Sequence, residues 1–319
     1  MTTSRTRILN ADADGAIPEA ARLLRDGKLV AFPTETVYGL GANALDADAV
    51  TRLFAAKGRP ATNPLIVHIS AESQVGQVAA TWPAVASKLA AKFWPGPLTL
   101  VVPKHPAIPD SVTGGGPTVA VRCPAHPVAQ ALLVAVGLPV AAPSANRSGE
   151  LSPTTASHVA RSLDGRIDLI LDGGPCSGGI ESTVVDVSGP TVRLLRPGLI
   201  GVADLEALVG LVELGLPTTP TNGAMPSPGM LTKHYAPQTP LEVADGEGEL
   251  EFLASLYETA GLKVARLKFL GGPQEVASQL YAELHRLDDA KYDRIIVQLP
   301  PNTDDWRAVR DRLTRAAAE

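Results

Sequence analysis

The sequence contains few of the residue types that mark several large classes of protein. Its 319 residues include only two cysteines, Cys123 and Cys176, which are too few for a disulfide framework or a zinc site. We therefore expect both thiols to be reduced and the protein to be cytoplasmic. Aromatic residues make up 4% of the chain and hydrophobic residues 45%, so alanine, valine and leucine must build most of the core.

The sequence also lacks an excess of positive charge and long apolar runs. Lys and Arg number 28 against 33 Asp and Glu, which gives a net charge of −5, whereas a general polyanion binder is strongly basic. Contacts with nucleic acid or phosphate must therefore be local. No run approaches the roughly 20 apolar residues of a membrane span, and the N-terminal residues have no apolar signal core. We expect neither membrane association nor export.

The length and the distribution of proline predict two domains, since a domain averages about 150 residues. Residues 1–215 alternate apolar strands with amphipathic helices, which indicates a large α/β domain. Residues 216–240 lose this periodicity and are rich in Pro, Thr and Gly, as a linker is. Residues 241–319 have a β-α-β-α-β-α pattern, so we expect a small, three-layer, Rossmann-like α/β domain.

Residues 29–41 form the stretch around which the large domain is organised. A buried apolar strand ends at Pro33, and the turn after it carries three hydroxyl groups and a carboxylate before two glycines. This is more hydrogen-bonding capacity than a turn needs, and the glycines allow close approach of the backbone to a ligand. An ordinary connection between a strand and a helix remains the alternative.

Polar side chains stand at the ends of other apolar segments as well. Lys57 and Arg59 leave the end of a predicted helix, His68 interrupts a strand, and Arg122 ends another, where a guanidinium is costly unless it finds a partner. Simpler explanations remain for two of these features: Lys57 and Arg59 are favourably placed charges at a helix C-terminus, and His68 is a core or edge histidine. Because strand ends line ligand crevices in open α/β sheets, one shared pocket would explain them together. No metal-ligand cluster, Ser-His-Asp signature or Walker loop is visible, so this pocket must act by positioning and charge.

Short motifs mark these segments along the chain: PTETVYGLG, KGRP, NPLIVH, TVAVRCP, PSAN, SPT, ESTVVDV, LLRPG and SPGMLTKHYAP. Together they resemble the threonylcarbamoyl-AMP synthase family. The resemblance covers about residues 17–237, as a YrdC-like α/β domain with a twisted mixed sheet, followed by its linker. The C-terminal unit looks like the accessory domain of the family's longer form, although it is short and its motifs are weak.

The resemblance implies an enzyme that joins L-threonine, bicarbonate and ATP into threonylcarbamoyl-AMP and pyrophosphate, for threonylcarbamoyladenosine modification of tRNA. It also implies Mg²⁺ with the ATP, held by phosphates and water rather than by ligands we can name. The expected partners are downstream tRNA threonylcarbamoyl transferase proteins, and contact with tRNA itself is expected too. The chemistry suits the residues, because a carbamate is already a nucleophile and needs charge neutralisation and alignment.

By similarity, the resemblance also implies roles for individual residues. The catalytic residues would be Lys57 and Arg59. ATP would be bound by Lys57, Asn63, Thr118, Ser144, Asn146, Ser152, Arg196 and Tyr235. Threonine would be bound by Thr34, His68, Arg122, the backbone at Ala142, and Ser182. Residues 227–237 would close over the occupied pocket as a lid, for which a solvated proline-rich spacer is the alternative.

Two other functions remain open on the sequence alone. One is a carbamoyl-transfer enzyme that activates a different substrate with ATP. The other is a module that binds tRNA or double-stranded RNA without catalysis, with Arg52, Lys57, Arg59 and Arg147 lining a basic concavity. Pyrophosphate release that requires both threonine and bicarbonate would separate these functions.

Overall fold

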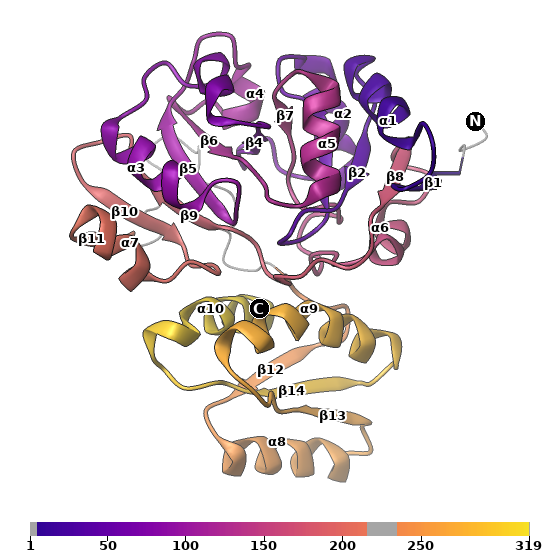
Figure 1. Cartoon of the computed structure of the whole chain (residues 1–319). Helices are drawn as coiled ribbons and strands as arrows, with labels where there is room; N and C mark the ends of the chain where they lie inside the picture. Colours follow the sequence, from indigo (N-terminus) through magenta and orange to yellow (C-terminus); the bar gives the residue numbers. More distant parts are fainter. Residues whose placement is uncertain (1–4, 216–234, 319) are drawn as a thin grey trace.

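The structure is a computed structural model, and it describes residues 5–215 and 235–318 (Figure 1). Residues 5–215 form one domain around a large sheet, and residues 241–318 form a second, smaller domain around a sheet of their own. Within the described residues, no helix is both long enough and apolar enough to cross a membrane.

The large domain is built on an 11-stranded sheet in its described residues, with the order β1-β8-β2-β3-β7-β4-β6-β5-β9-β10-β11. The strands are β1 (Arg7–Asn10), β2 (Val30–Phe32), β3 (Gly39–Asn43), β4 (Ile66–His68), β5 (Leu98–Pro103), β6 (Thr118–Arg122), β7 (Val140–Ala141), β8 (Leu169–Asp172), β9 (Thr183–Asp186), β10 (Val192–Arg196) and β11 (Val212–Leu214). The sheet contains both parallel pairs, such as β4 with β6, and antiparallel pairs, such as β5 with β6. The expected mixed sheet is therefore confirmed.

Helices cover both faces of the large sheet and create two cores. They are α1 (Ala16–Arg25), α2 (Ala47–Lys57), α3 (Ala84–Phe93), α4 (Asp110–Thr113), α5 (Pro127–Val136), α6 (Ala156–Leu163) and α7 (Val202–Val209), with a 3₁₀ helix at Glu72–Gln77. Successive side chains of a strand point to opposite faces, so Val30 and Phe32 pack with α1 and α5 while Ala31 packs in the other core with α2, α3 and α6.

Helix α2 shows how the local sequence delivers side chains to the pocket. The Asp46 carboxylate caps its first turn by accepting hydrogen bonds from the backbone N–H groups of Asp48 (2.9 Å) and Ala49 (3.0 Å). Gly58 ends the helix with φ 60°, a conformation that glycine adopts without strain. The turn after this glycine carries Arg59 toward the sheet.

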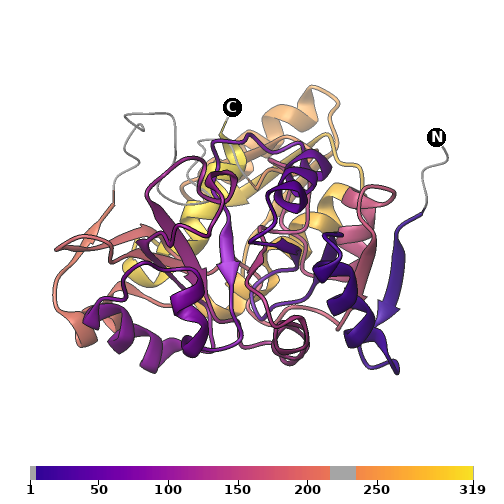
Figure 2. The ribbon, with the colours of Figure 1, turned by 90° about the horizontal axis from the view of Figure 1, so that it is seen from above.

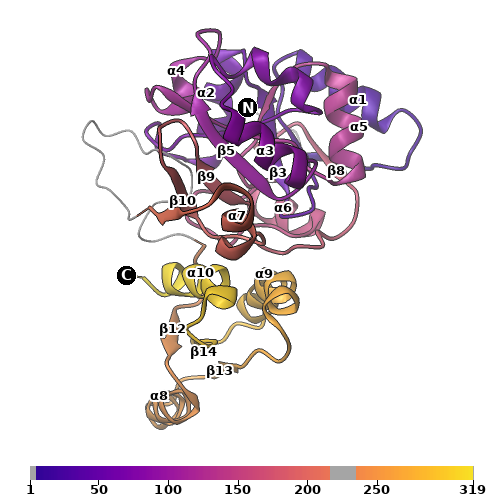
Figure 3. The same cartoon turned by 60° about the vertical axis from the view of Figure 1, so that its left-hand side comes forward.

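The small domain has a parallel three-stranded sheet in the order β12-β14-β13, with β12 (Leu241–Ala244), β13 (Val264–Leu267) and β14 (Arg294–Gln298). Its helices are α8 (Glu247–Thr259), α9 (Pro273–Asp289) and α10 (Arg307–Ala317), with a 3₁₀ turn at Asp304–Trp306. Helix α8 covers one face, and α9 and α10 cover the other, between this sheet and the large domain (Figures 1 and 3). The expected three layers are confirmed.

The two domains share a hydrophobic core. Val37, Leu151 and Ile180 of the large domain belong to the same buried cluster as Leu280 and Tyr281 of α9. Seen from above, the ribbon of the small domain lies behind that of the large one (Figure 2). The small domain is therefore packed directly against the turn at Val37, which follows the expected site residue Thr34.

Candidate active site

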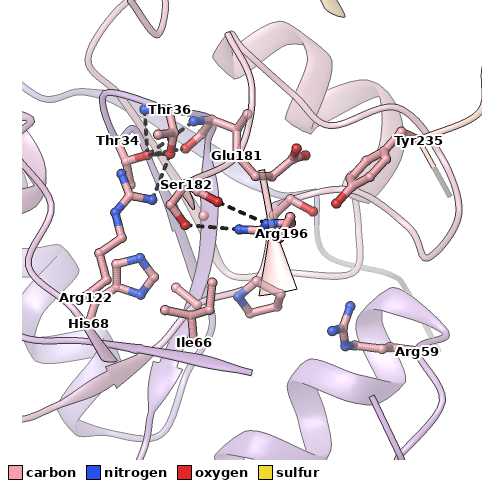
Figure 4. A pocket seen from close by; sticks show the side chains of 15 residues that line it. Thr34, Thr36, Arg59, Ile66, His68, Arg122, Glu181, Ser182, Arg196 and Tyr235 are labelled. Atoms are coloured by element: carbon pink, nitrogen blue, oxygen red, sulfur yellow. Dashed lines mark hydrogen bonds between the residues drawn. The ribbon is translucent and has the colours of Figure 1, made fainter. Parts of the chain in front are cut away.

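The pocket that gathers the expected site residues lies where several strands of the large sheet begin or end, next to Tyr235 (Figure 4). It is lined by Thr34, Thr36, Val37, Gly39, Arg59, Ile66, His68, Arg122, Ala142, Pro143, Ser144, Glu181, Ser182, Arg196 and Tyr235. These residues come from segments spread over about 200 positions of the sequence. The shared pocket expected at the strand ends is therefore present.

Arg122 is held in place by three groups at one end of the pocket. Its Nη1 donates to Thr36 Oγ1 (2.9 Å), its Nε donates to the Gly96 carbonyl (3.2 Å), and its Nη2 forms an ion pair with Glu35 Oε1 (2.7 Å). Only 4% of the Arg122 side chain and 14% of the Glu35 side chain are exposed, so the pair is buried. The guanidinium of Arg122, which the sequence predicted to need a partner, is paired with the carboxylate of Glu35.

The turn at Thr34 is fixed by its own side chain. Thr34 Oγ1 donates to the Val37 carbonyl (2.6 Å) and lies 2.8 Å from Thr36 Oγ1, which in turn receives the hydrogen bond from Arg122. Two of the hydroxyl groups that seemed to exceed the needs of a turn thus orient both the turn and the arginine.

His68 is a buried, neutral histidine at the end of β4. Burial, followed by the nearby charge of Arg122, lowers its pKa to about 3. Its Nδ1 has no hydrogen-bond partner among the described residues, although His68 lines the pocket. A neutral imidazole with a buried, unpaired nitrogen is able to form a hydrogen bond with a polar ligand atom.

Ser182 and Arg196 form a second hydrogen-bonded unit in the pocket. Arg196 Nη2 donates to Ser182 Oγ (3.0 Å) and its Nε donates to the Ser182 carbonyl (3.0 Å), as Figure 4 shows. Ser182 Oγ also lies 2.7 Å from Thr99 Oγ1 on β5. This serine is fully buried, so its hydroxyl has a fixed place beside the arginine.

Lys57 and Arg59 occupy different positions, although only Gly58 separates them in sequence. The Lys57 ammonium donates to the backbone carbonyls of Ser144 (2.5 Å) and Asn146, and Lys57 does not line the pocket. Arg59 does line it, and donates to Asn63 Oδ1 (2.6 Å) and the Pro64 carbonyl (2.8 Å). In this arrangement Lys57 holds the turn at Ser144, while Arg59 faces the cavity.

Burial shifts the pKa of both cations downward. It lowers the pKa of Lys57 well below its ordinary value, with the charge of Arg59 adding to the effect. It also lowers the pKa of Arg59 to about 10, with a further contribution from Arg196. An anionic ligand would offset this accumulation of buried positive charge.

The structure brings together most of the residues named from the sequence. Those that line the pocket are Thr34, Arg59, His68, Arg122, Ala142, Ser144, Ser182, Arg196 and Tyr235. Those that do not line it are Lys57, Asn63, Thr118, Asn146 and Ser152. Asn63 instead holds Arg59, and Ser152 Oγ donates to Glu181 Oε1 (2.5 Å). Binding roles for these outer residues remain predictions.

Sequence reasoning gave no role to Glu35, Thr36 or Glu181. The first two stand inside the PTETVYGLG motif, where a carboxylate beside a buried strand is a signal that a cationic partner exists. Glu181, next to Ser182, is likewise a carboxylate beside a buried strand and indicates a cationic partner. Its partner Arg312, however, lies 131 positions away in the other domain, so its pairing could not be found from the sequence.

Together, the fold and the pocket define a two-domain α/β protein with a cationic binding pocket at the strand ends of a mixed sheet. A family model described as "Telomere recombination" matches residues 22–198, and one described as "Threonylcarbamoyl-AMP synthase, C-terminal domain" matches residues 200–318. The chain therefore belongs to the threonylcarbamoyl-AMP synthase family, in its two-domain form.

Two relatives and one solved structure show how far this similarity extends. A Bacillus subtilis protein named threonylcarbamoyl-AMP synthase is 45% identical over 95% of this chain and 93% of its own length. A Pyrococcus abyssi protein of the same name is 42% identical over 93% of each. The crystal structure of P. abyssi Sua5 complexed with L-threonine has a TM-score of 0.92 at 40% identity, and the match covers 98% of both chains.

Proposed function

We propose that this chain condenses L-threonine, bicarbonate and ATP into threonylcarbamoyl-AMP and pyrophosphate, and that the pocket at Arg122 and Arg196 is the active site. The observation that carries the proposal is this pocket, in a chain that matches relatives of that name along both domains. P. abyssi Sua5, which shares the fold over its whole length, has been crystallised with L-threonine.

The end of the pocket that contains Arg122 suits an amino acid. A guanidinium has five N–H donors, and the contacts with Thr36, Gly96 and Glu35 need only three of them. The remaining two N–H groups can donate two hydrogen bonds to a carboxylate, in the bidentate geometry that arginine favours. We assign to threonine this arginine, the turn at Thr34, neutral His68, the backbone at Ala142, and Ser182.

The end of the pocket that contains Arg59 and Arg196 suits a triphosphate. Both arginines are buried, and Ser144 and Tyr235 line the same pocket. We assign to ATP these four residues, with Lys57, Asn63, Asn146, Ser152 and Thr118 as an outer layer that fixes them. Mg²⁺ would enter with the nucleotide and be held by phosphates and water, since no cluster of acidic, histidine or cysteine side chains suited to a metal occurs in the described residues.

The chemistry needs no covalent nucleophile from the protein. Burial raises the pKa of the Cys176 thiol to about 12 and also raises the pKa of the Cys123 thiol, so neither is a thiolate at neutral pH. The carbamate of threonine would itself attack the α-phosphorus, while the arginines neutralise the developing charge and hold the reactants in line. We further propose that the product passes to a tRNA threonylcarbamoyl transferase, which places the reaction in the cytoplasm with tRNA.

The deciding experiment measures pyrophosphate release from ATP by the purified chain, with threonine and bicarbonate each omitted in turn. We expect release only when both are present, and threonylcarbamoyl-AMP as the second product. Release without threonine would favour a carbamoyl-transfer enzyme for another substrate. Tight tRNA binding with no release under any condition would favour the non-catalytic RNA-binding module.

The lid expected at residues 227–237 lies mostly outside the described residues, which resume at Tyr235. Tyr235 is 1% exposed and lines the pocket, and its ring lies 5.9 Å from that of Tyr281 on α9. Closure of this segment over bound substrates stays a prediction.

A further inference from the structure

Arg312, on helix α10 of the small domain, is a buried cation with contacts in the large one. Only 1% of its side chain is exposed. Its Nε donates to Glu181 Oε2 (2.7 Å), its Nη2 donates to the Pro197 carbonyl (3.0 Å), and its Nη1 donates to the neighbouring Asp311 (2.6 Å). Its guanidinium carbon also lies 5.2 Å from the centre of the Tyr235 ring.

Each residue that Arg312 contacts outside the small domain either lines the pocket or is next in sequence to a residue that lines it. Glu181 lines the pocket and precedes Ser182, Pro197 follows Arg196, and Tyr235 is itself a lining residue. Ser182 and Arg196 are also hydrogen-bonded to each other. One side chain of the small domain thus touches both segments that carry this pair, together with the end of the segment that connects the domains.

Glu181 is the shared acceptor of this arrangement. Besides Arg312, its carboxylate accepts hydrogen bonds from Ser152 Oγ (2.5 Å) and from the Tyr281 hydroxyl, which lies 3.1 and 3.2 Å from its two oxygens. Burial by itself raises the pKa of Glu181, but the charges of Arg312 and Arg196 and the bond from Ser152 outweigh it, and the net pKa is lowered. The carboxylate is therefore ionised and held by donors from both domains.

The backbone next to Glu181 also packs closely against the small domain. Gly179 has φ 73°, and a Cβ at this position would collide with the carbonyl oxygens of Ala277 and Ser278 on α9. Ile180 is fully buried in the core that the two domains share. Residues 179–181 thus lie against α9 and α10 through backbone, apolar and charged contacts, immediately before Ser182.

We propose that Arg312 and Tyr281 are positioning residues for the active site of the large domain: by fixing Glu181 they set the places of Ser182 and Arg196. The small domain then contributes to substrate binding without touching the substrates. This inference rests on the proposed function, because its readout is the handling of threonine and ATP.

The test compares Arg312→Gln and Tyr281→Phe with the parent chain in the pyrophosphate-release assay, at a temperature well below every melting midpoint. We expect both variants to raise the KM for threonine and for ATP, at least tenfold for Arg312→Gln and several-fold for Tyr281→Phe. Arg307→Gln is the matched control, because Arg307 lies on the same helix and pairs with exposed Asp304 in its own domain. It should keep the parent's constants.

A purely structural role would give a different pattern. It would lower the melting midpoint while leaving the KM values of the folded variant unchanged, and that result would overturn the inference. If Arg312→Gln does not fold because it isolates Glu181, Tyr281→Phe decides, since it removes a single hydroxyl donor and keeps the ring. The double variant Glu181→Gln/Arg312→Gln should have KM values no higher than those of Arg312→Gln alone, because both changes break the same interaction. Increases in KM that add up across the two changes would contradict the proposal.

The proposed function and the inference fail in distinguishable ways. A parent chain that releases no pyrophosphate with all three substrates present would refute the proposed function, and the inference with it. An active parent with unchanged KM values in both variants would refute the inference alone.

Discussion

The two domains place their charged side chains differently. In the large domain Lys57, Arg59, Arg122 and Arg196 are all less than 10% exposed, and all stand in or beside the pocket. In the described part of the small domain, Arg312 is the one Lys or Arg that is buried, whereas Arg266, for example, forms its ion pairs with Glu251 and Glu258 on the outer surface.

Burial separates the charges that matter for function from those that do not. Exposed ion pairs contribute little, because water and salt screen them. A buried charge is expensive unless it is paired and hydrogen-bonded, so it persists where it serves a purpose. Three buried cations of the large domain, Arg59, Arg122 and Arg196, line its own pocket, whereas the buried cation of the small domain contacts the large one.

Replacement of Arg122 by alanine should have the largest effect, because it acts on stability and on the site together. Loss of the arginine leaves Glu35 buried without its partner, which typically costs about 3–5 kcal/mol of unfolding free energy. Threonine binding should fall below detection. Denaturant unfolding and calorimetry with threonine at saturating ATP measure the two effects.

A matched control for Arg122 lies in the same sheet. Arg193 on β10 pairs with Glu213 at 3.0 Å, but both side chains are about half exposed. Arg193→Ala should cost less than about 1 kcal/mol and leave threonine binding unchanged. If Arg193→Ala were as damaging as Arg122→Ala, burial would not be what distinguishes the important charges from the unimportant ones.

Replacement of Gly179 by alanine tests the contact between the domains. The left-handed backbone conformation at this position is unfavourable for any residue with a side chain, and the added Cβ would collide with the backbone of α9. We therefore expect the free energy of unfolding to fall by about 2–4 kcal/mol. Thermal unfolding should show it, and protease should cleave between the domains more readily. Gly137→Ala, also at positive φ but with nothing within 4 Å, should show only the backbone penalty of about 1–2 kcal/mol. Equal losses in the two variants would mean that the approach of α9 is unimportant.

Local patterns in the sequence indicated where polar side chains gather. Apolar runs that end in polar groups drew attention to Thr34, His68 and Arg122, and these residues line one pocket because strand ends meet at one edge of a sheet. One prediction from glycines was wrong. Residues 39–41 were expected to belong to a turn, but they lie in strand β3, which is antiparallel to β2. A Cβ on Gly41 would lie 3.0 Å from Phe32 Cε1 and 3.1 Å from Val140 Cγ1, so glycine is required there by close packing of strands.

Contacts between distant segments could not be predicted in the same way. The family resemblance assigned Lys57 to ATP, and this role stays a prediction. In the structure its ammonium donates hydrogen bonds to the carbonyls of Ser144 and Asn146. Nothing local reveals that those carbonyls converge on the end of α2. The pairing of Glu181 with Arg312 likewise depends on how two domains dock, for which a single sequence offers no periodic signal.

The smallest predicted effect concerns two histidines stacked across the domain interface. The rings of His158 on α6 and His285 on α9 have centroids 3.8 Å apart, and His285 Nε2 lies 3.2 Å from the Ser152 carbonyl. Burial, then the charges of His285 and Arg161, lowers the pKa of His158 to about 4 against an opposing effect of Asp289. Burial also lowers the pKa of His285.

Because the folded state holds both imidazoles neutral, their contribution to stability is complete above the ordinary histidine pKa of about 6.5 and is lost as pH falls from there toward 4. We expect the melting midpoint to fall over this interval, and His158→Gln to flatten the fall. His105→Gln, remote from the interface, should retain the parent's profile. The effect should be modest because His158 is partly exposed and solvent screens its charge. An unchanged pH profile in His158→Gln would show that the stacked pair does not couple the docking of the two domains to protonation.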